Sequence, residues 1–224
     1  MSKLTLPIFP LPNVVFFPKM ILPLHVFEPR YKRMIRDTLR KERRIGINLL
    51  KEGWQEDYYG SPPIHTIGCM GEIEQYERLP EGRFNILLRG TNRFEILSYE
   101  KETPYRIASI RLLKDTPFGI ERYDQIKERD VLFERFVRYF KTVLGMDIDE
   151  DRIDRKGSLE SMVNQIASIL DIPVREKQEL LEASNLRQRF DLVKSIVETE
   201  LNYADKLRRV VSNMKFAPNE PELN

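Results

Sequence analysis

The pattern of apolar and polar positions divides the chain into two halves. Up to about residue 118, short apolar runs alternate with turn-forming residues, which is typical of β-strands. Beyond that point, apolar residues recur every three or four positions, which is typical of amphipathic helices. We therefore predict an α+β protein with a β-rich domain over 1–118, a helical domain over 119–212 and a flexible tail over 213–224.

The β-rich half opens with an apolar segment that prolines interrupt every few residues. Proline has no amide hydrogen to donate, so it favours strand starts, edges and bends. Pro29 differs, because it precedes residues with helical spacing and proline is favoured in a first helical turn. The predicted strands cover 3–9, 13–17, 20–26, 44–50, 66–79, 83–90, 93–102 and 104–115, and the early helix covers 29–43. We expect these strands to form an antiparallel sheet that curls into a barrel-like sandwich.

Four helices are predicted in the second half, and the last is the longest. Ser158 and Pro173 mark the starts of the second and third helices, because both residue types are favoured where helices begin. The fourth covers 185–211, and Asn185 with Gln188 resembles a capping box at its start. At 1.5 Å per residue this helix is about 40 Å long. That length exceeds what a small bundle needs, so its far end is expected to project.

Composition and charge narrow the classes of function. The 224 residues include 37 basic and 35 acidic ones, and the net charge of +2 gives no overall attraction to nucleic acid or anionic membranes. No segment approaches the roughly 20 apolar residues that cross a bilayer. The one cysteine, Cys69, cannot form an intramolecular disulfide, which fits a reducing compartment. We expect a cytoplasmic protein without a signal peptide.

Sequence motifs of catalysis and metal binding are absent. The chain has no P-loop, no G-x-S-x-G and no H-E-x-x-H, and its two histidines do not cluster with carboxylates at metal-ligand spacing. His25 lies in an apolar strand, where a structural role is favoured over that of a catalytic base. An enzyme would need a pocket that brings His65, Cys69 and a carboxylate together. We therefore predict a protein that is not an enzyme and that uses no cofactor or metal.

The loop 53–63 is a candidate recognition surface. Trp54, Tyr58 and Tyr59 lie there among polar residues and turn formers, between two predicted strands. Aromatic side chains on loops give a large contact area at low entropic cost, which suits a binding surface. The alternative is that one or two of them only cap the open end of the barrel.

A second candidate surface surrounds the bend at Pro18. Phe16, Phe17 and Met20 flank this bend, and apolar residues at a bent sheet edge could accept an extended peptide by strand addition. Together with the aromatic loop they form the predicted peptide-binding or partner-binding set. The alternative is again that they fill the protein's own core.

The early helix carries a basic stripe. Arg33, Arg36, Arg40 and Arg43 recur at steps of three and four, so they would share one helical face over 29–43. Such a face could contact the phosphates of a nucleic acid. A helix face that is only exposed to solvent, opposite an apolar face, would show the same spacing of arginines. We favour this interpretation over a phosphate-binding stripe.

Several motifs resemble the amino-terminal, substrate-binding domain of the Lon protease family. They occur in the family's order and cover about residues 4–212. The motifs are LPIFPL (6–11), VFFPKMILPL (15–24), FEPRY (27–31), IGCMGEIEQ (67–75), GRFNILLRGTNRFEI (82–96) and a helical part at 171–201. The resemblance implies a PUA-like pseudo-barrel followed by a helical bundle, as in the related domain of cereblon.

The resemblance also implies a function. Lon proteases continue into an ATPase module and a Ser-Lys peptidase, whereas this sequence contains the recognition part without them. A stand-alone module that binds exposed apolar segments of unfolded or partly folded polypeptides, or docks on a separate protease or chaperone, is therefore expected. RNA binding is the alternative, because PUA-like barrels also bind RNA. No membrane partner is expected.

Overall fold

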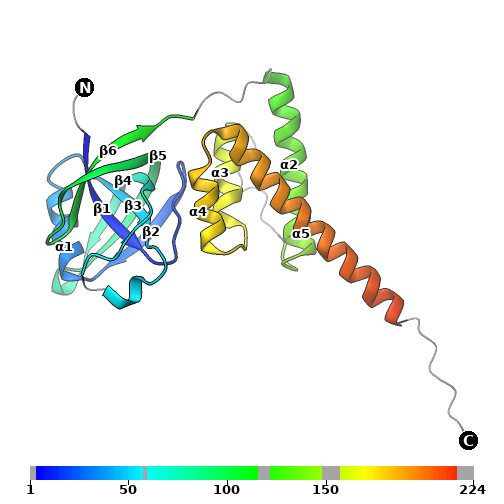
Figure 1. The fold of residues 1–224 in the computed structure, drawn as a ribbon, viewed down its shortest axis with the longest axis horizontal. Helices are drawn as coiled ribbons and strands as arrows, with labels where there is room; N and C mark the ends of the chain where they lie inside the picture. The colour runs from blue at the N-terminus through cyan, green and yellow to red at the C-terminus, as the bar shows by residue number, and fades with distance from the viewer. Residues whose placement is uncertain (1–3, 58–59, 116–121, 148–156, 216–224) are drawn as a thin grey trace, which may run out of the picture.

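The computed structural model describes residues 4–57, 60–115, 122–147 and 157–215 (Figure 1). The described parts contain a sheet of strands followed by helices, and the predicted boundary near 118 lies outside them. The strands are β1 (Leu4–Leu11), β2 (Ile21–Val26), β3 (Arg44–Leu49), β4 (Ile67–Arg78), β5 (Phe84–Lys101) and β6 (Arg106–Leu113). The α-helices are α1 (Pro29–Thr38), α2 (Arg122–Thr142), α3 (Leu159–Ile169), α4 (Val174–Glu182) and α5 (Leu186–Lys215).

The strands form one mixed sheet in the order β2-β5-β4-β3-β1-β6. Because β6 also pairs with β5, the sheet closes into a ring of strands, as the sequence predicted. The prediction of a purely antiparallel sheet is wrong at one pair, since β1 runs parallel to β3 with Ile8 opposite Gly46. Parallel neighbours need a long crossover connection, and here it contains β2 and α1.

The strand β5 replaces two predicted strands. Residues 91–92 were expected to separate the strands 83–90 and 93–102, because Gly90 and Asn92 are turn formers. In the structure Gly90 pairs with Gly71 and Asn92 pairs with Met70. The extra residue, Thr91, therefore forms a bulge, and its hydroxyl donates to the carbonyl of Met70 at 3.0 Å. A bulge bends a strand without ending it, which allows β5 to pair with β2, β4 and β6.

The early helix is shorter than predicted. The helix α1 ends at Thr38 instead of residue 43, and Arg43 adopts a left-handed backbone conformation with φ of 57°. The amide of Arg43 donates to the carbonyl of Thr38 at 3.3 Å, which turns the chain into β3. Arg40 therefore lies beyond the helix as well.

The segment between β1 and β2 forms no strand over 13–17, in contrast to the prediction. It bends because its two phenylalanines enter different cores. Phe16 packs among the side chains of the strand ring, whereas Phe17 packs among those of α2, α3 and α5. Both side chains are buried, so their assignment to a peptide-binding surface is corrected. Met20 is partly buried and contacts both cores.

Hydrogen bonds also join the sheet to the helices. The side chain of Gln178 donates to the carbonyl of Ile67 at 3.0 Å, and that of Asn164 donates to the carbonyl of Pro18 at 3.4 Å. These bonds and Phe17 hold the helical part against one side of the ring (Figure 1).

The predicted helix starts and the projecting last helix are confirmed. The hydroxyl of Ser158 accepts from the amide of Ser161 at 3.1 Å, which caps α3. At the start of α5, the amide of Gln188 donates to the side chain of Asn185 at 2.9 Å. The far half of α5 extends past the other helices (Figure 1). None of the helices in the described ranges is long and apolar enough to cross a membrane.

Candidate functional site

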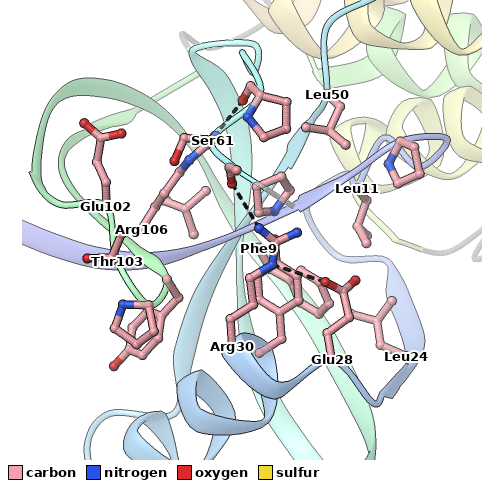
Figure 2. A pocket seen from close by; sticks show the side chains of 18 of the residues that line it. Phe9, Leu11, Leu24, Glu28, Arg30, Leu50, Ser61, Glu102, Thr103 and Arg106 are labelled. Atoms are coloured by element: carbon pink, nitrogen blue, oxygen red, sulfur yellow. Dashed lines mark hydrogen bonds and ion pairs between the residues drawn. The ribbon is translucent and has the colours of Figure 1, made fainter. Parts of the chain in front are cut away.

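A cavity of about 330 Å³ lies where several parts of the β half meet (Figure 2). It is bounded by the ends of β1 and β2, the start of α1, the loop residues 60–62, and the connection from β5 to β6. Each of these segments is an end or a loop of the ring, so the cavity forms where the regular sheet stops. Sites of this kind take ligands because a rigid scaffold positions variable loops.

Apolar side chains form much of the cavity wall. The ring of Phe9, from β1, stacks on that of Tyr31, from α1, with centroids 4.2 Å apart. Leu24 of β2 lines the same cavity, and Phe27 lies in its wall with 59% of its surface exposed. A large exposed aromatic beside buried ones provides apolar area that a ligand could cover.

Arg30 ties the start of α1 to the loop. Its Nε donates to the carboxylate of Glu28 at 3.1 Å, and its Nη1 donates to the carbonyl of Gly60 at 3.1 Å. Its guanidinium carbon lies 4.8 Å from the centre of the Tyr31 ring. Figure 2 shows this arrangement in the middle of the cavity. Arg30 therefore fixes the loop against the apolar wall.

A second arginine and a tyrosine, Arg106 and Tyr105, line the cavity from the start of β6. Arg106 begins β6, is 7% exposed, and donates from Nη2 to the carbonyl of Pro62 at 2.6 Å. The hydroxyl of Tyr105 donates to the carboxylate of Asp37 at 2.8 Å. Burial, together with this hydrogen bond, raises the pKa of Tyr105 to about 12, so its phenol is protonated at neutral pH. Glu102 lines the cavity from an exposed position.

The predicted aromatic loop borders this cavity only in part. Gly60, Ser61 and Pro62, at the end of the loop, line it. Trp54 lies in a short 3₁₀ helix, Trp54–Asp57, and packs half-buried against side chains of the strand ring. Tyr58 and Tyr59 lie outside the described residues.

The predicted basic stripe does not form one helical face. Arg33 and Arg36 are exposed on α1, and Arg33 lies 4.0 Å from the carboxylate of Asp37. Arg40 and Arg43 follow the end of the helix, and Arg43 stacks over a tyrosine of β4. The four arginines therefore belong to two different backbone segments, α1 and the residues after it. The charge of Arg33 is also partly neutralised by Asp37.

The residues considered for catalysis lie apart. The thiol of Cys69 is buried in β4, which raises its pKa well above the ordinary value. The imidazole Nδ1 of His65 lies 3.0 Å from the carboxylate of Glu182 on α4, which joins the sheet to the helices. Neither residue lines the cavity described above. Within the described ranges, no three histidine, cysteine or acidic side chains form a metal-binding group.

Sequence reasoning missed Arg106, although a signal was present. Residues 106, 108 and 110 share one face of β6 because side chains alternate along a strand. Ala108 and Ile110 on that face are buried. A charged residue in phase with buried apolar ones indicates an inward-facing charge. Arg30 gave no comparable signal, because its position follows from the bend before α1.

The ring of strands, the attached helices and an apolar cavity with a few polar groups define an α+β domain suited to binding. Solved structures with a similar fold agree with this description. The Lon N-terminal domain protein from Xanthomonas campestris aligns with a TM-score of 0.60 and 21% identity, covering 86% of this chain and 98% of that chain. The N-terminal domain of Mycobacterium avium complex Lon protease gives a TM-score of 0.66 and 12% identity over 87% and 98%. At such identities the likeness shows the fold.

The sequence itself shows the family. The family described as the ATP-dependent protease La (LON) substrate-binding domain matches residues 5–199, so the chain belongs to it. The resemblance found in the motifs is thereby confirmed.

Curated relatives are whole Lon proteases. Lon protease from Buchnera aphidicola subsp. Schizaphis graminum is 23% identical over 216 residues, which are 96% of this chain and 27% of the relative. Lon protease from Anaeromyxobacter dehalogenans is 27% identical over 216 residues, or 94% and 25%. Lon protease 2 from Bdellovibrio bacteriovorus is 29% identical over 204 residues, or 88% and 25%. The chain thus spans about a quarter of the length of these relatives, and the matched domain is the substrate-binding one.

Proposed function

We propose that this chain is a non-catalytic recognition module that binds exposed apolar segments of unfolded or partly folded polypeptides. Membership of a substrate-binding domain family supports recognition of polypeptides. The observation that supports a particular binding surface is the composition of the cavity wall. There, Phe27 is 59% exposed beside the buried Phe9 and Tyr31. A separate protease or chaperone would then act on the bound chain.

The driving force is the burial of apolar surface. Each square ångström removed from water contributes about 25 cal/mol, but association and ordering costs offset much of this gain. A site that takes one or two side chains therefore gives weak and transient binding. Weak binding suits a module that must release its polypeptide again.

A titration tests the proposal. A labelled, reduced and carboxymethylated polypeptide, followed by fluorescence anisotropy, should bind in a saturable manner. Phe27→Ala should weaken binding about threefold or more, because it removes exposed apolar area from the wall. Tyr203→Ala is the matched control, since Tyr203 is 61% exposed on α5, away from the cavity. Equal affinity of the two variants would remove this wall from the proposal.

We also propose that the loop residues Trp54, Tyr58 and Tyr59 contribute to polypeptide binding, which would extend the binding surface beyond the cavity. Their place in the sequence supports this extension, because the same loop supplies Gly60 and Pro62 to the wall. A Trp54→Ala, Tyr59→Ala double variant should bind the same polypeptide less tightly. Unchanged affinity would restrict the surface to the cavity.

Salt separates polypeptide capture from nucleic-acid binding. Contacts with phosphates lose affinity steeply as ionic strength rises, whereas burial of apolar surface does not. The polypeptide titration should therefore change little between low and high salt. An RNA that binds tightly, releases with salt and loses affinity on Arg36→Glu and Arg40→Glu substitution would favour the alternative function instead.

A further inference from the structure

Arg106 is a buried cation that forms no ion pair with any of the described residues. Its side chain lines the cavity and is 7% exposed. A guanidinium has five N–H donors. Its contacts are the hydrogen bond from Nη2 to the carbonyl of Pro62 and a position 5.9 Å from the centre of the Tyr99 ring. In the described ranges, no carboxylate lies within ion-pair distance of it.

Two other buried arginines show the usual arrangement. Arg93 and Arg189 are 3% and 0% exposed, and both form ion pairs with the carboxylate of Asp115. A buried charge without a partner is costly, so proteins normally supply one. Arg106 differs from the other two because it lies at a cavity. The natural partner for it is therefore a negative group that a ligand brings.

The other charges of the cavity limit what that ligand can be. Arg30 is already bonded to Glu28, so these two charges offset each other. Glu102 lies in the wall and is exposed. A polyanion such as a phosphate ester would meet the exposed carboxylate of Glu102, whereas a single carboxylate requires only one guanidinium. Carboxylates also match the geometry of a guanidinium, often with two parallel hydrogen bonds.

The walls determine what the carboxylate is attached to. Phe9, Leu24 and Phe27 offer an apolar surface in the same cavity as Arg106. The volume of about 330 Å³ is at the small end of the range usual for ligand sites, which suits one or two residues. An apolar residue with a free α-carboxylate combines both features. A polypeptide supplies it at its C-terminus, and a free apolar amino acid supplies the same group.

We propose that the cavity binds the C-terminal residue of a polypeptide, with Arg106 as the contact for its α-carboxylate and the apolar wall for its side chain. This inference rests on the proposed recognition of polypeptides and names the part of the polypeptide that the cavity takes. A polypeptide is favoured over a free amino acid because the exposed Phe27 lies in the wall and can cover further residues of a longer chain.

Two peptides that differ in one group provide the first test. A labelled Gly/Ser peptide that ends in leucine is compared with the same peptide carrying a C-terminal amide. The free acid should bind at least tenfold more tightly, which corresponds to about 1.4 kcal/mol. The comparison needs no change to the protein, so misfolding cannot affect it. Equal affinities for the acid and the amide would overturn the inference.

Substitutions then assign the effect to Arg106. Arg106→Gln should abolish the preference for the acid, while Arg106→Lys should keep part of it because the charge remains. Arg111→Gln is the matched control, since Arg111 lies on the same strand but is exposed and paired with Glu95. Thermal melts establish that the variants fold. A full preference for the acid in Arg106→Gln would exclude the proposed contact, and the peptide pair tests the inference if that variant does not fold.

The remaining outcomes separate this inference from the function on which it rests. Free leucine should compete with the acid peptide only weakly; competition equal to that of the peptide would make the ligand an amino acid and overturn the inference. If the carboxymethylated polypeptide binds but the acid peptide does not, this inference fails and the proposed function stands. If the acid peptide binds and the unfolded polypeptide does not, recognition of internal apolar segments fails and the inference stands.

Discussion

Arg93 of β5 and Arg189 of α5 are bound to the same carboxylate. Nη2 of Arg93 lies 2.5 Å from Oδ1 of Asp115, and Nη1 of Arg189 lies 3.1 Å from Oδ2. Arg93 also donates to the carbonyls of Leu181 and Ala183, at 2.8 and 2.6 Å. These carbonyls lie at the end of α4, where a helix favours positive charge. Asp115 thus joins the strand ring to α5, and Arg93 extends this cluster to the end of α4.

Removal of that carboxylate should destabilise the protein strongly. Asp115→Ala leaves two buried guanidiniums without their negative partner, and breaking a buried pair costs about 3–5 kcal/mol. Urea denaturation measures the free energy of unfolding. Asp191→Ala is the control, because Asp191 forms an exposed pair with Arg187 worth about 0.3–0.5 kcal/mol. A similar small loss in both variants would contradict a structural role for this cluster.

The regular elements could be predicted from the sequence because local rules determine them. Ser158 caps a helix, as expected, since its hydroxyl can accept a backbone hydrogen bond wherever a helix begins. Predictions failed where contacts distant in sequence decide the backbone. The bulge at Thr91 depends on the pairing of β5 with β4, and the bend at 13–17 depends on two separate cores. No local pattern contains that information.

The site was predicted less well than the fold. The loop 53–63 was identified as a candidate surface, and its last residues do line the cavity. Phe16 and Phe17 were misassigned because an apolar residue beside a proline bend looks the same in sequence whether it is exposed or buried. Arg106 was missed because its significance depends on what surrounds it. The positions of its possible ion-pair partners follow only from the folded ring.

A single methyl group at Gly90 should disrupt the crossing of two segments. A Cβ at this position would lie 2.2 Å from the carbonyl oxygen of Phe17. The backbone cannot easily move away, because Gly90 exchanges hydrogen bonds with Lys19 and Met20 at 2.8 Å each. Gly90→Ala should therefore lower the free energy of unfolding by about 1–3 kcal/mol or more. Ser98→Ala, on an exposed part of β5, is the control and should change it little; a neutral Gly90→Ala would show that the crossing is looser than described.

Cys69 should be unreactive in the folded protein. Burial raises the pKa of its thiol well above the ordinary value, so almost no thiolate is present near neutral pH. The thiolate is the reactive form. Iodoacetamide should therefore modify the native protein very slowly and the urea-unfolded protein rapidly, as mass spectrometry can follow. Rapid modification of the native protein would mean that β4 opens far more readily than its buried position implies.

Tyr105 should make stability depend on alkaline pH. Burial first, and then the hydrogen bond to Asp37, raises its pKa from 10.0 to about 12 in the folded protein. The folded state thus holds the phenol proton more tightly than the unfolded state does. This contribution to stability is complete below about pH 10 and is lost as the pH rises towards 12. Tyr105→Phe has no proton to lose there, so its melting temperature should fall less over that interval than that of the unmodified protein. Tyr203→Phe, on the exposed side of α5, should follow the unmodified protein. Parallel curves for all three proteins would show that the phenol of Tyr105 ionises equally easily in both states.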